Sequence, residues 1–138
     1  MLHRFVSIGV AAIIAGSLVV IASASAHDPS ALPDCQGKLQ VRPSSIVFAC
    51  GDGGVYATGV QWSKWGTLSA TATATMHAND CEPNCAQGHF HTYAAIIVVS
   101  GTLRCSNGAT AYREIAYVPR SQGYPTARTK LDWMQLQC

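Results

Sequence analysis

The chain has 138 residues, a length that is typical of a single domain. Its formal net charge is +2, which argues against a nucleic-acid-binding protein, because such a protein needs a clustered basic face. Only 12% of the residues are charged and 49% are hydrophobic, so the composition excludes a disordered chain.

The first 26 residues predict a secretory signal peptide. A positive start at Arg4 precedes an apolar run over residues 5–22, and the small residues Ala24 and Ala26 offer a cleavage site. The alternative is an uncleaved membrane anchor, because the run approaches the roughly 17–25 residues that span a thin bilayer. The cleavage signal favours removal. We therefore expect a secreted, extracellular protein without a stable membrane span, either free or associated with the cell wall.

Residues 27–34 contain prolines and no periodicity, which predicts a flexible leader. After it, β-type patterns and Gly/Pro/Asn turns alternate along the chain, and no convincing amphipathic helix is found. The predicted strands lie at residues 36–41, 46–50, 55–62, 67–76, 93–100, 103–105, 110–118 and 130–138. This pattern predicts one all-β domain over residues 35–138, a small antiparallel β-sandwich or barrel stapled by disulfides.

Residues 67–76 show the clearest alternation. One face carries Thr67, Ser69, Thr71, Thr73 and Thr75, and the other carries Leu68, Ala70, Ala72, Ala74 and Met76. The period of two predicts a strand, because successive side chains of a strand point to opposite faces. Its apolar face is mostly alanine, so we expect a large side chain, Trp62 or Trp65, to pack over it.

All six cysteines follow the predicted cleavage site: Cys35, Cys50, Cys81, Cys85, Cys105 and Cys138. An even number in a small exported domain predicts a disulfide framework, although many connectivities are possible. A two-residue turn at Arg42 and Pro43 would place Leu39 opposite Ile46, and Cys35 opposite Cys50. Cys81 and Cys85 could then close a small loop, which leaves Cys105 and Cys138 as the third pair.

Three stretches together resemble a group of small, secreted, Cys-rich actinobacterial proteins of uncharacterised function. The stretches are Arg42-Pro43 followed by Ile46–Gly53, then Val60–Gly66, and then Asn79–His91. They cover under half of the mature chain. The resemblance implies export and a disulfide-stapled β-domain, and it carries no known active site.

The irregular segment over residues 77–91 contains the densest set of possible metal ligands. Cys81, Cys85, His89 and His91 are ligands of the kind that a structural zinc site uses, with Asp80 and Glu82 nearby. Export favours oxidised cysteines, however, so a looser zinc or copper site of His77, His89 and His91, with Asp80, is the stronger metal hypothesis. The preferred interpretation is a surface loop pinned by disulfides, with no cofactor.

Trp62 and Trp65, together with Tyr56, could form an aromatic platform for a sugar or a peptide. Positions three apart on a strand face opposite ways, so we expect one tryptophan in the core and at most one available to a ligand.

Candidate catalytic groups are sparse. Asp52 lies in a glycine-rich turn, so a hydrogen bond to its own backbone explains this residue more simply than catalysis does. No other carboxylate lies at a spacing from Glu114 that would indicate a catalytic pair. Basic residues are spread from Arg104 to Lys130, a pattern that is typical of a solvated surface.

The sequence therefore favours a secreted, non-enzymatic, monomeric module that binds an envelope polymer or a protein, with no catalytic residue assigned. An exported metal-binding protein and a small secreted hydrolase are the alternatives.

Overall fold

The structure is a computed structural model that describes residues 31–66, 68–123 and 131–138. The predicted signal peptide and the first part of the predicted leader, residues 27–30, lie outside these ranges. The described elements are β1 (Leu32–Pro33), β2 (Leu39–Gln40), β3 (Ser45–Val47), β4 (Val55–Trp65), β5 (Ser69–Asn79), β6 (Phe90–Arg104), β7 (Thr110–Pro119), the 3-10 helix η1 (Arg120–Gln122) and β8 (Met134–Gln135).

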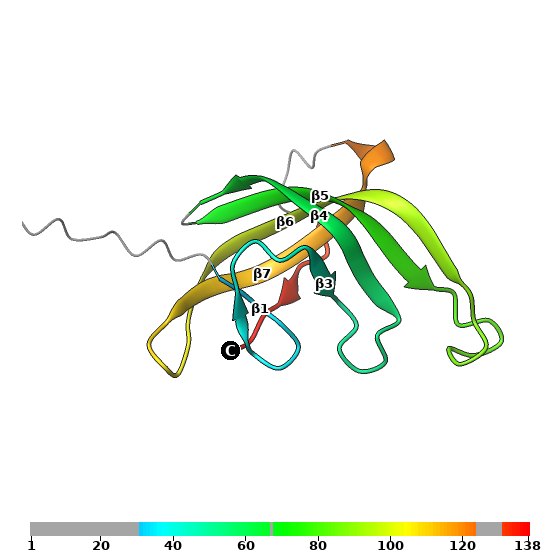
Figure 1. Cartoon of the computed structure of the whole chain (residues 1–138), viewed down its shortest axis with the longest axis horizontal. Coiled ribbons are helices and arrows are strands. Elements are labelled where there is room, and N and C mark those ends of the chain that lie inside the picture. The colour runs from blue at the N-terminus through cyan, green and yellow to red at the C-terminus, as the bar shows by residue number, and fades with distance from the viewer. Residues whose placement is uncertain (1–30, 67, 124–130) are drawn as a thin grey trace, which may run out of the picture.

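The main sheet is an antiparallel meander of six strands in the order β3-β4-β5-β6-β7-β8. It curls into a half-barrel whose body is formed by the long strands β4 to β7 (Figure 1). The short strands β3 and β8 form its two edges, and β1 and β2 form a separate small sheet beside them. The predicted all-β, antiparallel class is confirmed.

The alternation over residues 67–76 is confirmed within β5. Ala70, Ala72 and Met76 are fully buried and belong to the hydrophobic core, whereas Thr75, on the opposite face, is exposed. Leu68 departs from the prediction and is 68% exposed. It precedes the strand, in a tight turn that the backbone bond from Gly66 N to Ser69 O closes at 3.1 Å.

Both tryptophans cover the alanine face of β5, where we expected one of them to pack. Trp62 pairs with Ala72 and Trp65 pairs with Ala70, with a shift of register between Trp62 and Lys64. The expectation that the two rings face opposite ways is wrong, because this β-bulge inserts one extra residue and returns Trp65 to the concave face. The rings contact each other edge to face, with centroids 4.5 Å apart.

Residues 31–34 belong to the domain. Leu32 is only 3% exposed, and β1 pairs with β2 through Leu32↔Gln40 and Pro33↔Leu39. Within this part of the predicted leader, Leu32 and Pro33 therefore form a strand. Two residues are too few to show a periodicity, which explains why the pattern missed it.

The predicted disulfide pairs are the ones found: Cys35–Cys50, Cys81–Cys85 and Cys105–Cys138. The hairpin from which the first pair was predicted is not present, however. Leu39 pairs with Pro33 instead of Ile46, and Ile46 pairs with Ala57. The bridge thus ties the segment after β1 to the turn that follows β3, with 5.4 Å between the two Cα atoms.

Candidate functional site

An open cleft of about 530 Å³ lies between the two edges of the half-barrel. Ile46, Val47 and Phe48 line one side, residues 134–138 line the other, and residues 32–37 contribute the remaining wall. A second cavity of about 330 Å³ shares residues 32–36, Ile46 and Val47 with the first. The hollow therefore continues around β1.

The edge of β3 that faces away from β4 carries free backbone groups. Phe48 N donates to Val55 O at 2.9 Å, and Val60 N donates to Ser44 O at 3.0 Å. Because bonded and non-bonded positions alternate in an antiparallel ladder, Ser45 and Val47 direct their N–H and C=O groups away from β4. Both residues are exposed, and Cys35 Sγ contacts Val47 O at 3.8 Å, so the disulfide marks one end of this open edge.

The opposite edge of the cleft is built in the same way. Leu136 N donates to Arg113 O at 2.8 Å, and β8 pairs with β7 through Gln135↔Glu114 and Met134↔Ile115. By the same alternation, Gln135 directs its backbone groups away from β7. The cleft thus separates two strand edges, each with backbone groups that are not used in the main sheet.

The lining of the cleft is mixed in character. Ile46, Phe48, Met134 and Leu136 are partly buried and pack against the core with one side only. Gln36, Gln135 and Gln137 supply amide groups, and among the described residues Asp34 is the single charged side chain in the lining of either cavity.

The Asp34 carboxylate organises the turn between β1 and β2. Its Oδ1 accepts hydrogen bonds from the N–H groups of Gln36 at 2.9 Å and Lys38 at 2.8 Å, and its Oδ2 accepts one from Gln40 Nε2 at 3.0 Å. Desolvation acts to raise the pKa of Asp34, but the hydrogen bonds from Lys38, Gln36 and Gln40 together outweigh it and hold the pKa below its ordinary value. Asp34 therefore acts as a structural anion at the wall of the cleft.

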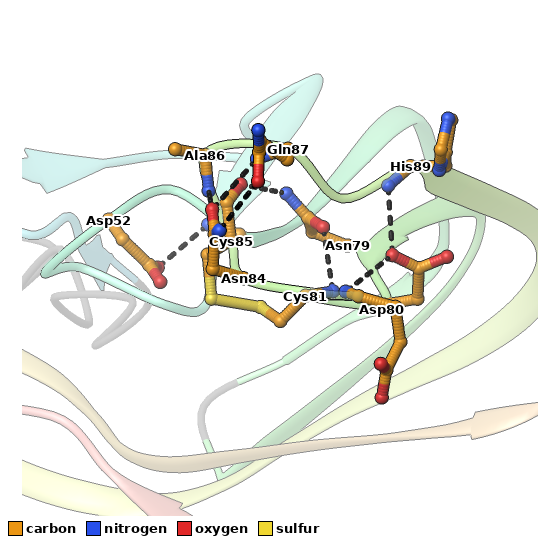
Figure 2. The surroundings of a disulfide bond; sticks show 11 residues. Asp52, Asn79, Asp80, Cys81, Asn84, Cys85, Ala86, Gln87 and His89 are labelled. Carbon is orange, nitrogen blue, oxygen red and sulfur yellow. Dashed lines mark hydrogen bonds between the residues drawn. A yellow bond between two sulfur atoms is a disulfide. The ribbon is translucent and has the colours of Figure 1, made fainter.

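The predicted metal segment is a loop closed by a disulfide. Cys81 and Cys85 are joined, which removes both as thiolate ligands for zinc (Figure 2). Asn79 ties the loop together, since its Oδ1 accepts from Cys81 N and its Nδ2 donates to Cys85 O, both at 2.9 Å. The irregular part is shorter than expected, because β5 extends to Asn79 and β6 begins at Phe90.

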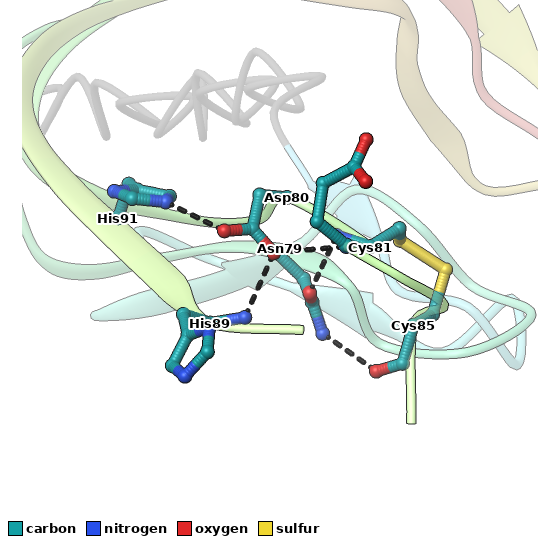
Figure 3. A network of polar contacts seen from close by, with 7 residues as sticks. Asn79, Asp80, Cys81, Cys85, His89 and His91 are labelled. Atoms are coloured by element: carbon teal, nitrogen blue, oxygen red, sulfur yellow. Dashed lines mark hydrogen bonds and ion pairs between the residues drawn. A yellow bond between two sulfur atoms is a disulfide. The ribbon is translucent and has the colours of Figure 1, made fainter. Parts of the chain in front are cut away.

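Asp80 is the centre of the polar contacts at the base of this loop. Its Oδ1 accepts from His89 N at 2.9 Å and Glu82 N at 3.1 Å, and its Oδ2 lies 2.9 Å from His91 Nε2 (Figure 3). The backbone bond from His89, then the contact with His91 and then the bond from Glu82 hold the pKa of Asp80 far below its ordinary value. The ring of His89 is turned away from the carboxylate (Figure 3).

The structure does not bring the three histidines of the metal hypothesis together. His77 pairs with Thr92 and His91 pairs with Ala78, so these two histidines lie on opposite faces of the sheet. His77 stacks on Tyr56 with ring centroids 4.5 Å apart, and its Nε2 lies 2.9 Å from Thr58 Oγ1. Within the described ranges, no group of three His, Cys, Asp or Glu residues is placed to hold a metal ion.

The three residues of the predicted aromatic platform are also separated. Trp62 and Trp65 are half-buried against the core, and Trp62 Nε1 donates to Pro43 O at 3.0 Å. Tyr56 pairs with His77 on the opposite face, where its ring also meets Phe90 at 5.5 Å. No single surface therefore presents these three rings.

The candidate catalytic carboxylates stand apart from the cleft. Asp52 Oδ1 accepts from Gly54 N at 2.8 Å, as expected of a turn residue. Glu114 is 5% exposed, and its Oε2 lies 3.4 Å from Gln135 Nε2. Neither residue lines the two cavities, and none of the histidines in the described ranges does so. Of the spread basic residues, Arg128 and Lys130 lie outside the described residues.

Sequence reasoning missed the cleft, whose walls come from segments about one hundred residues apart along the chain. The cysteine pattern carried the only signal, since Cys35, Cys50 and Cys138 all line it.

No family model, curated protein or solved structure matches the chain. Within the described residues, no helix is both long enough and apolar enough to cross a membrane.

Proposed function

We propose that the chain is a secreted, non-enzymatic module that binds a polymer or protein of the cell envelope or extracellular space in the cleft between β3 and β8. It acts as a monomer and without a cofactor. The observation that carries the proposal is the cleft itself, about 530 Å³ in volume and open between two sheet edges. A concave surface that combines apolar side chains with a few polar groups is a common form of binding site.

The covalent framework supports a preformed site. Cys35, Cys50 and Cys138 are wall residues of the cleft, and each belongs to a disulfide. The cleft walls therefore lose little conformational freedom when a ligand binds, which favours affinity. Three disulfides are also consistent with an oxidising, extracellular compartment.

The test is saturable binding to defined envelope fractions. The mature chain is labelled and titrated against insoluble cell wall, soluble wall polysaccharide and extracted surface protein. We expect saturation with at least one fraction. A Gln36→Trp variant, which places an indole at a wall shared by both cavities, should abolish it.

The matched control is Gln61→Trp. Gln61 is also an exposed glutamine, but it lies in β4 and lines neither cavity. This variant should bind like the unmodified chain. Binding that survives Gln36→Trp, or the absence of saturable binding to every fraction, would overturn the proposal.

A further inference from the structure

We infer that the ligand of the cleft is an extended polypeptide segment, which adds to the free edge of β3 as a further strand. The inference rests on the proposed binding function and names the chemistry of the ligand. It is carried by the orientation of the backbone at Ser45 and Val47, which leaves donors and acceptors pointing out of the sheet.

These backbone groups match a polypeptide better than a polysaccharide. The outward groups of Ser45 and Val47 are two residues apart, so they repeat at roughly 6.8 Å along the strand. An extended peptide presents N–H and C=O groups with the same repeat, and a sugar chain does not. Strand addition is a common way in which an open sheet edge binds a peptide.

The side chains of the cleft suit the same ligand. In an added strand, alternate side chains would point to the concave side, where Ile46 and Phe48 face Met134 and Leu136 across the cleft. The remaining side chains would point to solvent. Because Asp34 is the only charged side chain that the described part of the chain contributes to the lining, we expect apolar residues to alternate with neutral or basic residues in the ligand.

The experiment removes one outward N–H from β3. Proline lacks a backbone N–H, and at Val47 the lost group points away from β4, so the ladder with β4 keeps its hydrogen bonds. Val47→Ala is the matched control, because it shortens the side chain and keeps the N–H. Ser45→Pro is a second variant of the same kind, in case Val47→Pro impairs folding.

The probe is a display library of random linear peptides, from which binders of the unmodified chain are selected. We expect Val47→Pro to weaken the selected peptides about two- to twelvefold more than Val47→Ala does, as expected for one backbone hydrogen bond. N-methylation of alternate peptide bonds should weaken them similarly, and hydrogen exchange at the Val47 amide should slow on binding.

The other outcomes distinguish a failure of strand addition from a failure of the proposed binding function. If no peptide is enriched, or if Val47→Pro and Val47→Ala bind alike, strand addition is wrong. If Gln36→Trp still abolishes binding to an envelope fraction in that case, the cleft remains the binding site. If Gln36→Trp leaves all binding intact, the proposed function fails as well. Self-association that Val47→Pro abolishes would identify a second copy of the chain as the occupant.

Discussion

The three disulfides are expected to stabilise the fold to different extents, because they close loops of different lengths. Their sequence separations are 33 residues for Cys105–Cys138, 15 for Cys35–Cys50 and 4 for Cys81–Cys85. The loop-closure relation gives about 3.7, 3.0 and 1.9 kcal/mol, respectively, for the entropy that each crosslink removes from the unfolded chain. The longest loop should therefore contribute about twice as much as the shortest.

The assay is urea unfolding of paired alanine variants. The double variants Cys105→Ala/Cys138→Ala and Cys81→Ala/Cys85→Ala each lose one bridge and leave no unpaired thiol. The difference in the free energy of unfolding from the unmodified chain, obtained by linear extrapolation, gives the contribution of each bridge. A loss for the Cys81–Cys85 pair that equals or exceeds the loss for the Cys105–Cys138 pair would refute the reasoning from loop length.

Three further predictions concern local packing and charge. Gly88→Ala should destabilise the fold by about 1–3 kcal/mol in urea unfolding, because its Cβ would lie 2.1 Å from Asn79 Oδ1 and 2.7 Å from Cys81 N. Trp65→Ala should also destabilise the fold by the same measurement, by less than the ~3–5 kcal/mol of a fully buried tryptophan, since its partly buried ring covers the alanine face. The pKa of Asp80 is depressed in the folded state, so the ionised carboxylate stabilises the fold above pH ~4. This contribution is lost as the pH falls below that value. Asp80→Asn should therefore reduce the fall in Tm between pH 5 and pH 2.

The parts of the fold that depend on local pattern could be predicted from the sequence. The alternation through Ala70, Ala72 and Ala74 identifies both the strand and its buried face, because burial on one side of a sheet imposes a period of two. The Cys81–Cys85 pair could also be anticipated, because the two residues are close in the chain. The Cys35–Cys50 pair was inferred from a hairpin that the structure does not contain, so local pattern does not explain this pair or the Cys105–Cys138 pair that follows from it by elimination.

The failures occur where the backbone departs from the regular pattern. The bulge between Trp62 and Lys64 turns both tryptophans to the same face, and nothing in the residue types at that point marks an inserted position. Likewise, Leu39 lies at a spacing that suits a hairpin with Ile46, but Ile46 pairs with Ala57 of β4 instead, and Leu39 pairs with Pro33 of β1. Tertiary pairing therefore overrides the local signal.

The candidate site could not be predicted, because it arises from the closure of the sheet. The histidines at positions 77 and 91 appear close in the sequence, yet the register of β5 and β6 places them on opposite faces. In contrast, Val47 and Leu136 are far apart in the chain and line the same cleft. Residue spacing predicts shared faces within a strand but does not show which strand edges remain open.

The positions of the disulfides show that the long strands and the walls of the cleft are held in place by different means. Strands β4 to β7 have 10 to 15 residues each and are held by long ladders, and none of the six cysteines lies within them. Strands β1, β2, β3 and β8 have only two or three residues, and the Cys35–Cys50 and Cys105–Cys138 bridges anchor the segments that flank them. Covalent bonds thus hold the walls of the cleft where backbone pairing is too short to do so. This arrangement keeps the edges of β3 and β8 in place while leaving their outward backbone groups available to a ligand.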